Sequence, residues 1–247
     1  KSPDNANMQI ASKHSLRLLR LVNQLLDFQK LSAGRMNLET QPIDVNEFLN
    51  FCIEGVSSAA EARQIVFSVS LAQNPIFING NLDALEKIIF NLLSNALKYT
   101  SPGGTITLVS TQKAQKAKIS IRDTGVGITQ DRIQTVFDIF SESTTGTSRH
   151  EEGSGLGLAL VKELVESLNG TVGVASTPGE GSDFWVEFPV IEPPAHPSTD
   201  KIAIKNWLMA DLLPSSRMQI SEQEISFQGD VLPNTDQSIL VVDDIED

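Results

Sequence analysis

The sequence contains little of the chemistry that marks several classes of protein. Its single cysteine, Cys52, excludes an internal disulfide and a metal site built from several thiolates. It has no run of 18 or more apolar residues, and its first residues lack the charged and apolar regions of a secretory signal peptide. These absences predict a soluble, cytoplasmic chain. The apolar context NFCIEGV predicts that Cys52 is a buried structural residue.

Basic residues are also scarce. The chain carries 19 lysines and arginines against 31 acidic residues, which gives a formal net charge of −12. No dense cluster of lysine and arginine offsets this charge, so the composition argues against nucleic acid or an anionic membrane surface as a partner. With 247 residues, 40% of them hydrophobic and 20% charged, the chain can form one large or two small domains with a buried core.

The N-terminal segment has the periodicity of a helix. Apolar residues recur at helical spacing over 6–32, and the sequence SAG ends the pattern with Gly34 as a left-handed cap. One series steps by alternating intervals of four and three residues and forms a heptad seam: His14, Leu18, Leu21, Leu25 and Phe28. We therefore predict that this helix packs in a bundle or a dimer.

The middle of the chain mixes helices with short strands. Helices are predicted from Asp44, which can cap the first of them, and then at 81–99, 129–138 and 156–168. Strands are predicted at 65–71, 75–78, 105–111, 117–123, 171–176 and 182–190. This order, with mainly antiparallel strands, favours an α+β fold, a two-layer α/β sandwich, over a doubly wound parallel sheet. A polar stretch at 141–155 has no periodicity and is expected to be mobile.

One predicted helix contains a pair of asparagines in the segment NLLSNALKYT. Asn91 and Asn95 are four residues apart and share a face, with Lys98 one turn further on and Tyr99 beside it. Two amide oxygens on one face can bind a hard cation that already carries triphosphate oxygens, and a lysine can neutralise a phosphate. A polar helix face with a satisfied asparagine pair is the alternative.

Two glycine-rich segments come later in the chain. In DTGVG, the carboxylate of Asp123 could accept a hydrogen bond from an exocyclic amine, while Gly125 and Gly127 would let the backbone approach a planar ring. A simple tight turn is the alternative. In GSGLGL, at 153–158, the glycines open a helix whose free N–H groups suit a phosphate, although close helix packing would also need glycine. The spacing differs from the dinucleotide fingerprint, and no P-loop motif is present.

In this order and spacing, these segments resemble the ATP-binding domain of sensor histidine kinases, within the superfamily that also includes gyrase, the Hsp90 chaperones and MutL. The resemblance covers roughly 44–190, includes a third glycine segment at Gly179 and Gly181, and implies a Bergerat-type ATP-binding fold. It implies an ATP site built from these residues: Asn91, Asn95, Lys98, Tyr99, Asp123, Gly125, Gly127, Ile128, Gly153, Ser154, Gly155, Leu156, Gly157 and Leu158.

The resemblance also implies a role for each part of that site. Asp123 would bind the adenine amine, with Tyr99 near the base. Asn91 and Asn95 would face Mg²⁺. Lys98 and the backbone of the GSGLGL segment would contact the phosphates.

The lid of such a site would be formed by 141–152. Phe137 and Phe140, which match the F box of the family, are interpreted as core anchors for this lid. Arg149 lies within the lid and could reach the γ-phosphate; a solvated loop charge is the alternative.

His14 matches part of the phosphate-acceptor motif of these kinases, in which the histidine lies on the first helix of a dimerising hairpin. In HSLRLL, however, Ser15 replaces the acidic residue that could take a proton from the imidazole, and Leu19 replaces the helix-bending proline. Too few residues separate His14 from the end of what resembles the second hairpin helix. We therefore interpret His14 as a seam residue and place the acceptor upstream of residue 1.

The character of the chain changes after Val190. A proline-rich sequence, IEPPAHPSTD, follows, and the final ILVVDDIED resembles the first strand of a receiver domain, with Asp243 and Asp244 matching its acidic Mg²⁺ pocket. A stray strand is the alternative. The resulting division is a hairpin helix (1–34), an ATP-binding domain (35–190), a linker (191–237) and the start of a receiver domain (238–247).

These features predict part of a hybrid protein-histidine kinase that passes the γ-phosphoryl of MgATP to a histidine of the dimerisation hairpin. The expected partners are a second copy, through the N-terminal helix, and a receiver domain; the parent protein could be anchored in the inner membrane. A degenerate nucleotide-binding module is one alternative. An ATPase is another, but Glu86 is turned about 140° from the face of the asparagines and Lys87 lies there instead.

Overall fold

The computed structural model describes the following residues: 3–33, 38–139, 141 and 155–194. All of them lie in the first of two units, which are Lys1–Arg217 and Met218–Asp247. The expectations for several residues lie outside the described ranges: Gly34, Phe140, Arg149, Gly153, Ser154, Asp243 and Asp244.

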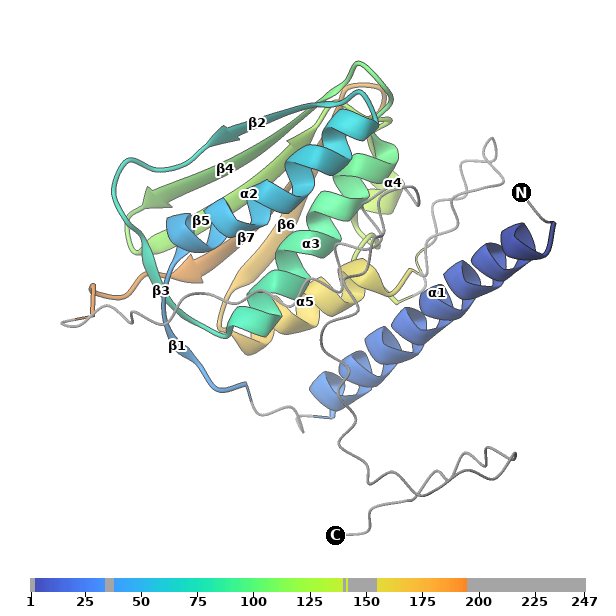
Figure 1. Ribbon diagram of the computed structural model, residues 1–247. Helices are drawn as coiled ribbons and strands as arrows, with labels where there is room; N and C mark the ends of the chain where they lie inside the picture. Colours follow the sequence, from blue (N-terminus) through green and yellow to red (C-terminus); the bar gives the residue numbers. More distant parts are fainter. Residues whose placement is uncertain (1–2, 34–37, 140, 142–154, 195–247) are drawn as a thin grey trace, which may run out of the picture. The chain divides into compact units, whose positions relative to one another are not determined.

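A five-stranded sheet forms one layer of the fold (Figure 1). The strands are, in spatial order, β2 (Val66–Ser70), β4 (Thr105–Lys113), β5 (Lys116–Asp123), β7 (Gly181–Pro189) and β6 (Thr171–Thr177). Only the β2–β4 pair is parallel, and the other neighbours are antiparallel. Along β5, Ile119 and Ile121 are buried whereas Lys116 and Arg122 are exposed, as expected for a sheet covered on one face.

Three helices form the second layer and cover one face of the sheet (Figure 1). They are α2 (Val45–Ala62), α3 (Leu82–Tyr99) and α5 (Gly157–Ser167). The Asp44 side chain accepts the N–H of Asn46 at 2.9 Å and caps α2, as predicted. This arrangement confirms the predicted two-layer α/β sandwich.

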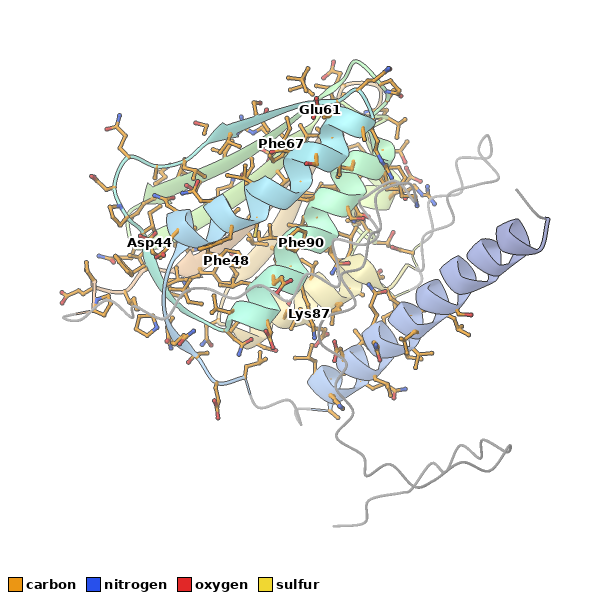
Figure 2. The ribbon with its side chains drawn as sticks, in the orientation of Figure 1. Asp44, Phe48, Glu61, Phe67, Lys87 and Phe90 are labelled. Carbon is orange, nitrogen blue, oxygen red and sulfur yellow. The ribbon has the colours of Figure 1, made fainter. Side chains whose placement is uncertain are left out.

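The core lies between the two layers. Figure 2 marks Phe48 of α2 and Phe90 of α3, two of the largest fully buried side chains. Cys52 is fully buried beside them in the same apolar cluster, and its burial, together with the nearby Glu86, raises the pKa of the thiol. Cys52 is therefore a protonated structural residue, as its sequence context predicts.

Two predictions about secondary structure need correction. The structure contains a strand that the sequence analysis missed, β1 (Gln41–Asp44), which pairs with β3 (Phe77–Gly80) in a separate two-stranded sheet. The helix expected at 129–138 is a single turn, α4 (Gln130–Ile133). None of the residues of α4 is buried, and Val136 and Phe137 beyond it pack against the core from turns, so their burial does not require a longer helix.

Helix α1 (Pro3–Ser32) confirms the predicted N-terminal helix, and its last turns contact the sandwich. Leu31 is buried and Phe28 packs against the core, whereas Leu18 remains 64% exposed. Asp27 and Lys87 form an ion pair at 2.5 Å, with 22% and 17% of their side chains exposed (Lys87 is labelled in Figure 2). This pair connects α1 to the helix that carries the two asparagines.

We expect Asp27→Asn to lower the free energy of unfolding by about 1–2 kcal/mol, because it leaves the largely buried ammonium of Lys87 without its charge partner. Urea denaturation would measure the change. Glu187→Gln, which breaks an ion pair with the 59% exposed side chain of Lys116, is the control and should cost less than about 1 kcal/mol. Equal losses from the two substitutions would contradict the expectation.

Candidate nucleotide-binding site

The two asparagines of α3 lie on the half-buried side of the helix. Asn91 donates its side-chain N–H to the carbonyl of Lys87 at 2.7 Å, which leaves its Oδ1 directed away from the helix backbone. A Cβ atom placed on Gly157 would lie 2.8 Å from this oxygen. The absence of a side chain at Gly157 therefore lets the start of α5 approach Asn91, and the structure brings these two predicted segments together.

The start of α5 is the helix terminus at which the sequence predicts a phosphate. Gly155 has a φ of 65°, a conformation that favours glycine, and the helix begins two residues later at Gly157. Leu156 occupies the N-cap position and provides no side-chain cap to the first N–H groups. These N–H groups and the positive end of the helix dipole are suited to an anion. Leu158 packs against the core as part of the first turn.

Lys98 and Tyr99 lie together at the end of α3. The ammonium of Lys98 is 3.1 Å from the Tyr99 hydroxyl and 4.7 Å from the centre of its ring. The cation and the aromatic face attract each other electrostatically, so the tyrosine holds the lysine at the end of the helix. Both side chains remain partly exposed, as they must to contact a ligand.

Asp123 ends β5 and has only 8% of its surface exposed. Its Oδ1 accepts the N–H of Gly125 at 2.8 Å, and Asp123 is the strand partner of Ser182 on β7. Burial raises the pKa of Asp123 above its ordinary value, and hydrogen bonding from the backbone counteracts only part of that rise. A buried carboxylate with unused acceptor positions can take a hydrogen bond from an exocyclic amine.

The glycines after Asp123 are required by contacts within the protein as well as by any ligand. A Cβ on Gly125 would lie 2.4 Å from the carbonyl oxygen of Tyr99, and a Cβ on Gly127 would lie 2.1 Å from that of Thr177. Gly127 also has a φ of 67°. The DTGVG motif predicts that these glycines admit a planar ring, and the structure adds a close approach of backbone to backbone. Ile128, the last residue of this loop, packs against the core.

The turn between β6 and β7 contacts residues 123–128, which we call the Asp123 loop. The N–H of Gly179 donates to the carbonyl of Val126 at 2.9 Å, and Gly181 passes so close that a Cβ would lie 1.9 Å from the carbonyl oxygen of Asp123. Ser176 accepts the N–H of Ile128 at 2.8 Å. The sequence motifs include the two glycines of this turn but not Ser176, because its bond to Ile128 joins residues 48 apart in the sequence.

The F box is described only in part. Phe137 packs against the core and meets the Phe184 ring edge to face, with the ring centres 6.2 Å apart, which agrees with its interpretation as an anchor. The lid at 142–152 lies outside the described residues, and the side chain of His14 is not described either.

Nucleotide affinity should depend on the protonation of Asp123. Because its pKa is raised, the carboxyl takes up a proton at a pH where an ordinary aspartate is still ionised, and the protonated form offers a donor where the amine needs an acceptor. We expect ADP affinity to be constant above the raised pKa and to fall by up to about tenfold per pH unit below it. Titration calorimetry across this range would test the expectation. Adenosine, which has no phosphate to titrate, should show the same fall, and a flat profile for adenosine would contradict it.

Comparison with known proteins places this site in a family. Residues 80–192 match the family described as "Histidine kinase-, DNA gyrase B-, and HSP90-like ATPase". Sensor protein GacS of Pseudomonas syringae pv. syringae is 35% identical over 179 residues, which cover 70% of this chain and 20% of GacS. Hybrid signal transduction histidine kinase A of Dictyostelium discoideum is 30% identical over 243 residues, which cover 93% of this chain and 11% of that protein.

A solved structure gives the same result. Full-length ShkA in complex with AMPPNP superposes with a TM-score of 0.70 at 28% identity, over 79% of this chain and 40% of ShkA. The chain spans 20% or less of the length of GacS and of the Dictyostelium kinase. Among the described residues, no helix is long and apolar enough to cross a membrane.

Proposed function

Because residues 80–192 belong to the histidine kinase-, DNA gyrase B- and HSP90-like ATPase family, we propose that this chain is the ATP-binding part of a protein-histidine kinase. It would bind MgATP and present the γ-phosphoryl to a histidine of the dimerisation hairpin. The observation that carries the proposal is the close approach of Gly157, at the start of α5, to Asn91, whose Oδ1 lies 2.8 Å from where a Cβ on Gly157 would be. This approach would place a cation ligand beside a phosphate-binding helix terminus.

The residues of the site divide the recognition of the nucleotide between them. Asp123 would accept the adenine amine, and Tyr99 would lie near the base. Lys98 would leave its contact with Tyr99 to meet a phosphate, while the first N–H groups of α5 bind the phosphate oxygens. Asn91 and Asn95 would hold Mg²⁺, which neutralises charge on the transferred group when it is bound.

The chain itself supplies positioning and charge neutralisation rather than a nucleophile. Asp123 would hold the base and the start of α5 would hold the phosphates, and since the two lie on different elements the nucleotide would be fixed at both ends. Such orientation lets the acceptor imidazole approach in line with the bond that breaks. We place the acceptor histidine upstream of residue 1 and regard His14 as a seam residue.

The test is transfer of label from γ-labelled ATP in the presence of Mg²⁺, with the 247-residue chain alone and with a chain extended upstream. We expect acid-labile, base-stable label on the extended chain only. Label on the shorter chain that His14→Ala removes would show that His14 is the acceptor. If neither chain is labelled although the shorter one binds ADP, the proposal fails and a nucleotide-binding module without kinase activity replaces it.

The proposal includes the domain division and two partners. Helix α1 would be the second helix of the hairpin (1–34), followed by the ATP-binding domain (35–190), a linker (191–237) and the start of a receiver domain (238–247). An exposed apolar stripe on α1 supports a second copy of the chain as partner: Leu18, Leu19, Val22, Leu25 and Leu26. Sedimentation analysis that found only monomer at high concentration would contradict the dimer.

The likeness to a hybrid kinase over 93% of this chain supports a receiver domain in the same parent protein. We place the site in the cytoplasm, as part of a parent that could be anchored in the inner membrane. Isolation of the parent protein and a test of its membrane association would decide that point.

A further inference from the structure

One hydroxyl group joins the β6–β7 turn to the far end of the Asp123 loop. The N–H of Ile128 donates to the Oγ of Ser176 at 2.8 Å, and Ser176 Oγ donates to the carbonyl of Gly181 at 2.7 Å. The Oγ of Ser182 lies 3.0 Å from it. A serine hydroxyl has one hydrogen and two acceptor positions. Since its hydrogen goes to Gly181, Ser182 must be the donor in the serine pair, and all positions of the Ser176 hydroxyl are then used.

This network connects both ends of the Asp123 loop. Ser182 of β7 is the strand partner of Asp123, which begins the loop, and its hydroxyl bonds to that of Ser176. Ser176 in turn holds the N–H of Ile128, which ends the loop. The four residues between these fixed points, 124–127, therefore close around a pair of adjacent serines on β6 and β7.

At the start of the loop the Thr124 hydroxyl accepts the N–H of Thr105 at 2.9 Å, and the contacts of Val126 come from backbone atoms. Val126 donates its N–H to Tyr99 at 3.3 Å and accepts the N–H of Gly179 at 2.9 Å, while its side chain is 56% exposed. The loop therefore contributes little apolar burial of its own before Ile128 reaches the core. Within the described residues, Ser176 provides the side-chain oxygen that satisfies the Ile128 N–H, so removing this oxygen leaves a partly buried donor without that bond.

We propose that Ser176 is a positioning residue of the nucleotide site, which keeps the loop from Gly125 to Ile128 in the shape that base recognition by Asp123 requires. The proposal rests on the proposed function for its consequence, nucleotide affinity. Its structural part, the restraint of the loop by the Ser176 hydroxyl, can be measured without any nucleotide.

The experiment uses the full chain with Ser176→Ala, Ser176→Thr and a control, Ser68→Ala. Ser68 makes a similar hydroxyl pair with Thr107, at 3.0 Å, on β2 at the opposite edge of the sheet. Hydrogen exchange of backbone amides is measured in each variant without ligand, and the dissociation constant of ADP is measured by calorimetry.

We expect Ser176→Ala to speed exchange of the Ile128 amide at least about tenfold, leave the amides of β4 and β5 unchanged, and weaken ADP binding about tenfold. Ser176→Thr, which keeps the hydroxyl, should restore both values to within about threefold, and Ser68→Ala should change neither. A purely structural role would speed exchange throughout the sheet.

The outcomes separate the two proposals. Unchanged exchange at Ile128, or an ADP affinity unchanged by Ser176→Ala, would overturn the positioning role. Failure of the unsubstituted chain to bind ADP would overturn the proposed function instead, while exchange at Ile128 would still decide whether Ser176 restrains the loop.

Discussion

Asp123→Asn should weaken ADP binding at least about 100-fold without unfolding the protein. The carboxylate of Asp123 accepts the backbone N–H of Gly125 and retains acceptor positions for the adenine amine. An asparagine has a single oxygen, which the Gly125 donor would occupy. Its NH₂ group would then face the adenine amine, and two donors would oppose each other in a buried site.

Although Asp123→Asn should weaken ADP binding, it should not lower the free energy of unfolding. The folded-state pKa of Asp123 lies above its unfolded value, so the folded protein becomes less stable as pH rises through the interval between the two and stays so at neutral pH. Because asparagine carries no charge, Asp123→Asn should leave the free energy of unfolding unchanged or slightly higher at neutral pH. Urea denaturation at neutral pH would measure this.

Asp183→Asn is the matched control for both measurements. Asp183 follows Ser182 on β7 and pairs with Arg122 at 2.9 Å, with 24% of its side chain exposed. It belongs to the open face of the sheet, so ADP binding should not change. Loss of binding in both variants, or full binding by Asp123→Asn, would contradict the role of Asp123.

Much of this arrangement follows from local patterns in the sequence. The helical spacing of apolar residues predicts α1, α2, α3 and α5, and alternation predicts the five strands of the large sheet, because each of these elements buries a periodic face. β1 was missed because it buries one apolar side chain, Ile43, in four residues. α4 was predicted too long because the residues after Ile133 form turns, from which Val136 and Phe137 pack against the core without a helix.

In the candidate site, too, local motifs could be predicted from the sequence, whereas tertiary contacts could not. Asn91, Asn95 and Asp123 could be predicted because short motifs contain them. The brace from the β6–β7 turn could not be, since the bond from Ile128 to Ser176 spans 48 residues of sequence and depends on the order of strands in the sheet. The glycine motifs identified the loop correctly, but part of the reason for the glycines, contact with Tyr99 and Thr177, is tertiary.

Gly181→Ala should have the largest effect on stability, lowering the free energy of unfolding by about 3 kcal/mol or more and abolishing ADP binding with it. Gly181 has a φ of 111°, which alone disfavours any residue with a side chain. The added Cβ would also lie 1.9 Å from the carbonyl oxygen of Asp123 and 2.9 Å from the Cα of Thr124. Since both are backbone atoms of the loop, relief of the clash requires β7 and the Asp123 loop to separate.

Gly103→Ala separates the effect of backbone strain from that of the steric clash. Gly103 has a φ of 84°, but a Cβ there would meet nothing within 4 Å, so this variant should cost only the backbone strain, about 1–2 kcal/mol, and leave ADP binding intact. The excess loss in Gly181→Ala over Gly103→Ala, measured by urea denaturation, then reports the steric contact between the turn and the loop. If the two variants lost equal stability and bound ADP equally well, the close approach of Gly181 to Asp123 would not matter for the site. A much larger loss of unfolding free energy in Gly181→Ala, together with loss of ADP binding, would instead mean that the β6–β7 turn holds the Asp123 loop in place.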